Sequence, residues 1–147
     1  MKKMKIILII FLTFSVSSAF SQLKTDSIDL KSFWSEYVEP LIDKDFEKIK
    51  SIVHFPLEGE WGFMMELKKD EINWSQVDFI ENYDKLFDDK IIGLLKELNY
   101  TDAELFNNEI LVGIGWKDES GISESGIIFR YKEVNGQWRL CVIQGVG

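Results

Sequence analysis

From residue 107 onward the side chains alternate with a period of two, and this pattern constrains the fold more than any other feature of the chain. The expected inner face carries Ile110, Val112, Ile114 and Trp116, then Ile127, Phe129 and Tyr131, then Trp138, Leu140 and Val142. A period of two places alternate side chains on one face of a strand. Between the last two runs, Asn135-Gly136 is the dipeptide that favours a tight hairpin turn. We therefore predict an antiparallel sheet in the C-terminal part of the chain.

The first half of the chain carries helical patterns. Phe33, Tyr37 and Leu41 repeat every four residues within 29–42, where Pro40 is expected to end or bend the helix. A short helix at 44–52 and a strand at 60–68 are expected next. A further helix at 75–89 has 91–98 as its extension or as a second segment. Helices followed by a sheet predict an α+β domain, with N-terminal helices packed on one face of a strongly curved antiparallel sheet.

Two local signals support this assignment. Ser75 with Asp78 three positions later fits a capping box, and Trp74 with Phe79 fits a hydrophobic staple. Gly-Ile-Gly at 113–115 lies within a strand and opens no helix, so it is not a phosphate-binding loop. We expect a bend or a bulge there instead.

Residues 1–21 are typical of a secretory signal peptide. Lys2, Lys3 and Lys5 precede an apolar run at 6–14, and Ala19 and Ser21 are small residues at the expected cleavage site after Ser21. An uncleaved anchor is the alternative, but the run is shorter than the roughly 18 residues that span a bilayer. We expect a periplasmic or secreted protein in which 22–147 form a single domain that leaves the membrane after cleavage.

The net negative charge restricts the classes of partner that the chain can bind. The chain has 25 acidic and 17 basic residues, and cleavage after residue 21 would remove three lysines and no acid. Such a balance disfavours nucleic acid and anionic lipid, because a protein that binds a phosphate backbone must neutralise it. Cys141 is the only cysteine, so no internal disulfide can form. We expect it to pack as a small buried hydrophobe.

With these pieces in order, the chain resembles the nuclear-transport-factor-2-like superfamily, the cystatin-like α+β cone. The resemblance spans about residues 30–146 and depends on five segments: Phe33-Trp34, Asp45-Phe46, 53–57, 79–87 and 135–140. It implies a sheet bent into a cone that is open at one end and holds an internal pocket. It also implies a possible homodimer through the sheet. Because such folds host enzymes, ligand carriers, protein-binding modules and bacterial immunity proteins, the fold does not define the function.

His54 is the only histidine and the one candidate general base. A base needs an orienting partner within hydrogen-bond reach. Asp45 and Asp78 are the candidates, although the capping box explains Asp78 better. The alternative is a histidine packed at the junction of the second helix and the sheet.

One His, one Cys and scattered carboxylates lack the spacing of zinc or calcium ligands, so neither a metal nor a cofactor is expected.

Aromatic side chains are the remaining clue. Trp and Tyr bury large areas but need a partner for their polar atom, so some of them are expected to line a pocket. The candidate ligand-binding residues are Trp34, Tyr37, Trp61, Tyr83, Trp116, Tyr131 and Trp138; core filling is the alternative. The first hypothesis is an exported, non-catalytic binding module for a small apolar or peptide ligand. The second is a protein-interaction or immunity-type inhibitor module, and the third is a cofactor-free isomerase, dehydratase or hydrolase that uses His54.

Overall fold

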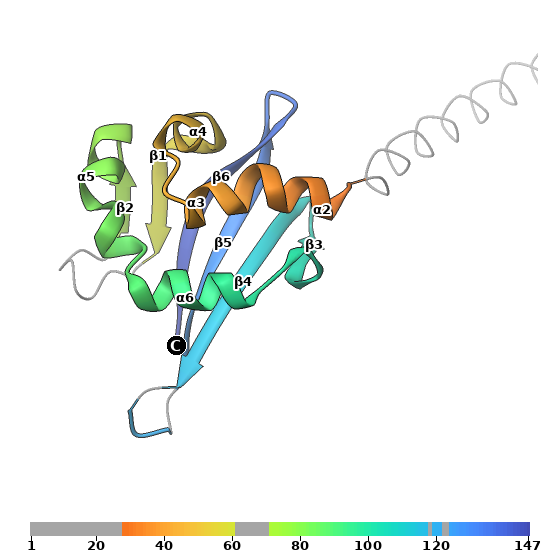
Figure 1. Ribbon diagram of the computed structural model, residues 1–147. Coiled ribbons are helices and arrows are strands. Elements are labelled where there is room, and N and C mark those ends of the chain that lie inside the picture. The colour runs from red at the N-terminus through yellow and green to blue at the C-terminus, as the bar shows by residue number, and fades with distance from the viewer. Residues whose placement is uncertain (1–27, 61–70, 118, 122–123) are drawn as a thin grey trace, which may run out of the picture.

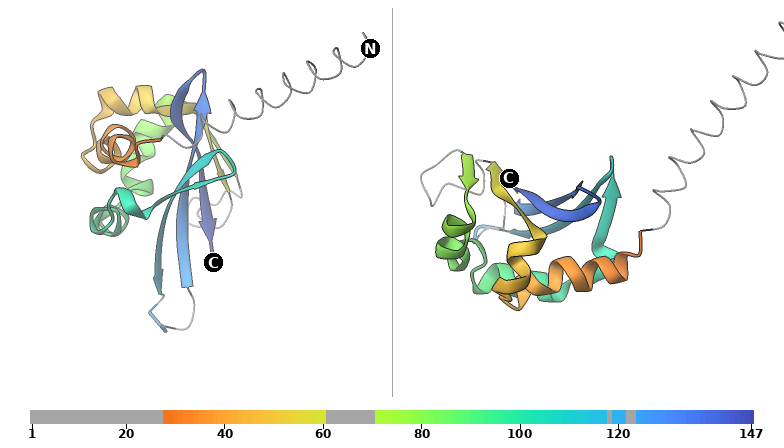
Figure 2. Two further views of the ribbon diagram at one scale, coloured as in Figure 1. Left: turned by 90° about the vertical axis from the view of Figure 1, so that its right-hand side faces the viewer. Right: turned by 90° about the horizontal axis from the view of Figure 1, so that it is seen from above.

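The computed structural model describes residues 28–60, 71–117, 119–121 and 124–147. These residues form an α+β fold, in which the helices lie on one side of a mixed six-stranded sheet (Figure 1 and Figure 2). The strand order is β2-β1-β6-β5-β4-β3. The predicted α+β class is confirmed.

The first helical run has three consecutive segments: α2 (Leu30–Phe33), a π-helical turn (Trp34–Val38) and α3 (Glu39–Ile42). The predicted helix over 29–42 is therefore present, but Pro40 does not end it. Pro40 lies in the first turn of α3, directly after the wider π-helical turn. Because the helical run continues through position 40, Pro40 removes one N–H from within it, and the altered hydrogen-bond pattern of the π-helical turn lies directly before this position.

The second helix leads directly into the sheet. Helix α4 (Phe46–Ile52) begins after Asp45, whose carboxylate accepts a hydrogen bond from the Lys48 backbone N–H at 3.2 Å. Strand β1 (Val53–Glu60) follows without a loop, and β2 (Glu71–Trp74) pairs with it in an antiparallel arrangement. Most of the strand predicted over 60–68 lies outside the described residues, and so does Trp61.

Two helices follow β2. Helix α5 (Gln76–Leu86) begins at the predicted capping box, in which both reciprocal hydrogen bonds between Ser75 and Asp78 are present. It ends before Phe87, which leaves the helical conformation. Helix α6 (Asp89–Glu97) then starts anew because the Asp88 side chain accepts a hydrogen bond from the Ile91 N–H at 2.8 Å. Residues 91–98 thus lie in a second helical segment and do not extend α5.

The C-terminal part of the chain forms the larger part of the sheet. A short 3₁₀ turn (Tyr100–Asp102) precedes β3 (Ala103–Phe106), which the alternation did not reveal. Strands β4 (Glu109–Lys117), β5 (Glu124–Val134) and β6 (Gln137–Val146) then pair antiparallel in sequence. Asn135 and Gly136 both have positive φ angles, 53° and 77°, as a tight hairpin turn requires. The predicted hairpin is confirmed.

The sheet differs from the prediction in two respects. It is mixed and not purely antiparallel, because β1 pairs parallel to β6, a strand more than eighty positions later in the chain. Of the bend or bulge expected at 113–115, the bulge is absent, since β4 and β5 pair in unbroken register. The shift lies in β6, where Tyr131 pairs with Leu140 but Arg130 pairs with Val142. The extra residue, Cys141, reverses the alternation, so Val142 shares the face of Arg130 and not that of Tyr131.

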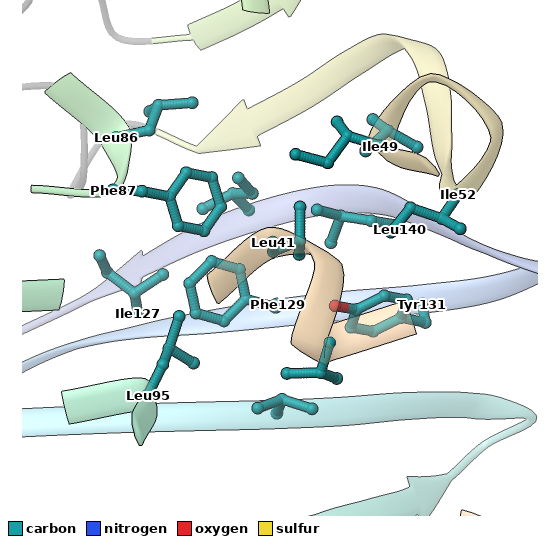
Figure 3. Close-up of a cluster of buried hydrophobic side chains, with 14 of the residues drawn as sticks. Leu41, Ile49, Ile52, Leu86, Phe87, Leu95, Ile127, Phe129, Tyr131 and Leu140 are labelled. Carbon is teal, nitrogen blue, oxygen red and sulfur yellow. The ribbon is translucent and has the colours of Figure 1, made fainter. Parts of the chain in front are cut away.

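The core lies between the helices and the sheet (Figure 3). Phe129 and Tyr131 from β5 and Leu140 from β6 lie there with Leu41 and Ile49 from the helices. The buried Tyr131 hydroxyl donates a hydrogen bond to the Tyr37 carbonyl oxygen at 3.2 Å. This bond ties the centre of the sheet to the first helical run, so the buried polar atom is satisfied.

Candidate ligand-binding site

A cavity of about 680 Å³ lies where the end of β4, the start of β5 and the end of β6 meet. These strand ends extend past helix α6 (Figure 1). The lining residues are Ile114, Gly115, Trp116, Lys117, Glu124, Ser125, Gly126, Val146 and Gly147. A volume of several hundred Å³ suits a small molecule or a short peptide segment. Of the six proposed ligand-binding aromatics that lie within the described residues, Trp116 alone lines this cavity.

Glycines shape the wall of the cavity because the backbones approach closely there. A Cβ atom on Gly126 would lie 2.6 Å from the Ile114 carbonyl oxygen and 3.0 Å from the Val146 Cγ2. The first distance is far inside van der Waals contact, and the atom concerned belongs to the backbone of β4. Glycine at position 126 therefore lets β4, β5 and β6 come together under the cavity.

The half-buried Trp116 ring is held from one side by α6. The Lys90 Nζ lies 4.1 Å from the centre of the indole ring, which is cation–π distance. Lys90 is exposed, so the contact contributes about 0.5–1 kcal/mol. The contact favours this ring orientation and places a positive charge beside the Trp116 ring. Because Lys90 lies on a helix 26 positions before Trp116, no local sequence pattern could have paired them.

The cavity offers both apolar and polar contacts. The Trp116 ring, Ile114 and Val146 supply apolar surface, whereas Ser125 carries a hydroxyl group. Lys117 and Glu124 are Cα partners across β4 and β5, so opposite charges lie at the end of the hairpin. The combination can hold an apolar group by burial and orient it with a few polar contacts.

Five other proposed ligand-binding aromatics lie within the described residues and pack into the core or at its margin. Trp34, Tyr83 and Tyr131 are buried, while Tyr37 and Trp138 are half-buried. Phe33 contacts three of these rings, with centroids 5.2 Å away for Tyr37, 5.0 Å for Tyr131 and 6.3 Å for Trp138. Phe33 and Phe79 are buried in the same core.

The buried tyrosine hydroxyls act as structural hydrogen-bond donors. Tyr83 donates to the Leu41 carbonyl oxygen, and burial raises the pKa of Tyr83 to about 12. Burial also raises the pKa of Tyr131 above its ordinary value. Because both phenols stay protonated at neutral pH, neither is suited to act as a base there.

His54 lies on β1 with its side chain exposed. Within the described residues it has no carboxylate at hydrogen-bond or ion-pair distance. Its two candidate partners serve elsewhere: Asp45 caps α4, and Asp78 closes the capping box of α5. The constellation of a base with an orienting carboxylate is therefore not assembled around His54 by the described part of the chain.

The best-formed charged cluster lies on the sheet face away from the helices. Arg130 donates to both carboxylate oxygens of Glu109, with its Nε at 2.8 Å and its NH2 group at 3.2 Å. Hydrogen bonding from Arg130 is the main cause that holds the pKa of Glu109 below its ordinary value. Lys132 Nζ adds a contact at 3.6 Å. This network is a structural ion pair across β4 and β5.

In the described ranges, no group of three or more His, Cys, Asp or Glu side chains is arranged to hold a metal ion. Among the same residues, no helix has both the length and the apolar character needed to cross a membrane.

Comparison with known proteins leaves the family open. No protein-family model matches the chain, and no significant match was found among curated proteins.

Proposed function

We propose that this chain is an exported, non-catalytic binding module that takes a small apolar or peptide ligand beside Trp116. The cavity of about 680 Å³ at the ends of β4, β5 and β6 carries the proposal. In this hypothesis the domain is a cone similar to the nuclear-transport-factor-2-like superfamily, and the cavity is its open end. Ligand sites commonly combine such a volume with one aromatic wall and a few polar groups.

Binding is favoured over catalysis by the way in which the titratable groups are used. Asp45, Asp78 and Asp88 accept hydrogen bonds from helix N-termini, and Glu109 is engaged by Arg130. The exposed His54 lies on β1, whereas the cavity is lined by the end of β4, the start of β5 and the end of β6. The enzyme hypothesis names His54 as the base, and a base must reach the reacting atoms. Glu124 and Lys117 line the cavity but His54 does not, so this hypothesis is the weaker one.

Export is the second part of the proposal and can be tested separately. If the signal peptide is cleaved after Ser21, the protein recovered from the periplasm or the medium begins at Gln22. Intact-mass measurement of the exported protein should show the loss of residues 1–21. A full-length mass in the membrane fraction would contradict export as a free domain.

Ligand binding can be tested with the apolar fluorescent dye 8-anilinonaphthalene-1-sulfonate as the probe. The wild-type protein is expected to bind it saturably with a rise in fluorescence. Trp116→Ala should weaken binding about tenfold, because an aromatic contact contributes on the order of 1.5 kcal/mol. Ser125→Phe should also weaken binding by filling the cavity. Val77→Ala is the matched control, since Val77 is 62% exposed on α5 and outside the cavity lining.

The variants also define the result that would refute this site. Circular dichroism should confirm that each variant is folded before its affinity is compared. Dye affinity that is equal in the wild type, Trp116→Ala and Ser125→Phe would place binding elsewhere. Native mass spectrometry of the exported protein would then identify the natural ligand by its mass.

A further inference from the structure

Strand β3 forms one edge of the sheet. It is last in the strand order, and among the described residues only β4 pairs with it. Its other edge therefore presents backbone N–H and C=O groups that β4 does not use. Figure 2 shows β3 at the border of the sheet, away from β1 and β2.

The exposed apolar side chains gather at this edge. The described residues include five large apolar side chains that are strongly exposed: Val77, Tyr100, Leu105, Phe106 and Val146. Three of the five lie in or just before β3, and two of these, Leu105 and Phe106, are 36% and 55% exposed. Natural edge strands are usually protected by short length, charged side chains, proline or a bulge. β3 is four residues long and carries the charge of Glu104, but it has no lysine, no proline and no bulge in its pairing with β4.

A groove adjoins the edge on the sheet face away from the helices. It has a volume of about 310 Å³ and is lined by Phe106, Asn107, Glu109, Leu111, Ile128, Arg130 and Gln144. Phe106 thus belongs both to the edge strand and to the groove wall. The charge on Arg130 is offset by the bidentate contact with Glu109. The groove can therefore receive an apolar side chain from a strand that lies beside β3.

We propose that the free edge of β3 binds an extended segment of another protein, which adds to the sheet as a seventh, antiparallel strand. Main-chain hydrogen bonds would supply the affinity, and the side chains opposite β3 would supply the specificity. Apolar side chains lie opposite Phe106 and Leu105, and a basic side chain lies opposite Glu104. Antiparallel addition is the more stable arrangement, and it sets the order apolar, apolar, basic along the partner.

Charge selects the partner. Glu104 is exposed on β3, and Asp102, the residue just before β3, is exposed as well. The whole chain carries 25 acidic against 17 basic residues. A basic, apolar segment is therefore attracted over long range and meets a carboxylate at the contact itself. The site shares no lining residue with the Trp116 cavity, so it stands or fails independently of the proposed ligand-binding function.

The test uses a fluorescein-labelled peptide with Phe-Val-Arg at its centre and threonines on both sides. Fluorescence anisotropy should show saturable binding to the wild-type protein, and the amides of β3 should become protected from hydrogen exchange. Glu104→Lys should weaken binding about fivefold or more, because an attractive cross-strand pair becomes repulsive. Phe106→Ser should weaken it as well. Val77→Ser removes an equally exposed apolar side chain from α5 and should leave the affinity unchanged.

Three results would overturn the proposal. The first is equal binding of a peptide with N-methyl groups on alternate backbone amides, since such a peptide cannot pair as a strand. The second is equal affinity of the wild type, Glu104→Lys and Phe106→Ser. The third is a homodimer in sedimentation whose β3 amides are already protected without peptide, because a second copy would then occupy the edge. Trp116→Ala should bind the peptide normally, which separates this site from the cavity.

Discussion

Three glycines in one strand pair permit a stringent test of the packing under the cavity. Gly126→Ala would place a Cβ atom 2.6 Å from the Ile114 carbonyl oxygen and 3.0 Å from the Val146 Cγ2. The first contact is with backbone, so β4 or β5 must move to relieve it. Overpacking of this kind costs about 1–3 kcal/mol. Gly115→Ala should have an intermediate stability, because its Cβ would meet the Ser125 carbonyl oxygen at an ordinary van der Waals distance of 3.6 Å.

Gly113→Ala is the matched control. No atom lies within 4 Å of its added Cβ atom, and Gly113 is exposed on β4. Alanine is favoured over glycine within a strand by about 0.5–1 kcal/mol, so this variant should be as stable as the wild type or slightly more stable. Gly126→Ala has the same intrinsic gain, so the free energy of unfolding should differ between Gly113→Ala and Gly126→Ala by the overpacking cost alone, about 1–3 kcal/mol.

Thermal and urea denaturation, followed by far-ultraviolet circular dichroism, measure this difference. For a domain of this size, 1 kcal/mol corresponds to a shift of about 4 °C in Tm, so Gly126→Ala should melt about 4–12 °C below Gly113→Ala. The order of stability should be Gly113→Ala, then Gly115→Ala, then Gly126→Ala. Equal stability of the first and last variants would refute the close approach of β4, β5 and β6.

Three further predictions follow from individual contacts. Tyr131→Phe removes the buried hydrogen bond to the Tyr37 carbonyl and should lower the free energy of unfolding by about 1–2 kcal/mol, measured by urea denaturation. Ser75→Ala removes the cap of α5 and should cost about 1 kcal/mol in the same assay; an unchanged midpoint would mean that the cap is not formed. Arg130 lowers the pKa of Glu109. The Glu109 carboxylate therefore stabilises the folded protein above the ordinary carboxylate pKa, and this stabilisation is lost as the pH falls through the lowered pKa. In thermal denaturation at decreasing pH, Glu109→Gln should lose less stability than the wild type. The same dependence of Tm on pH in both proteins would contradict the ion pair.

The sequence by itself determined the features that depend on neighbours a few positions apart. The capping box of Ser75 and Asp78 and the hairpin at Asn135-Gly136 are local, because their hydrogen bonds and φ angles depend on residues next to one another. The apolar period of two placed β4 and β5 correctly for the same reason. Local patterns of this kind predicted the α+β class and most of the helices.

Only the tertiary structure decided how distant segments meet. The parallel pairing of β1 with β6 joins strands more than eighty positions apart, and no periodicity encodes it. One extra residue at Cys141 moves Val142 to the other face, although the sequence around it still alternates. The candidate site depends on the same kind of contact: Trp116 was predicted from its residue type, but Lys90 and Gly126 join it only because the folded chain brings α6 and β5 to that end of the sheet.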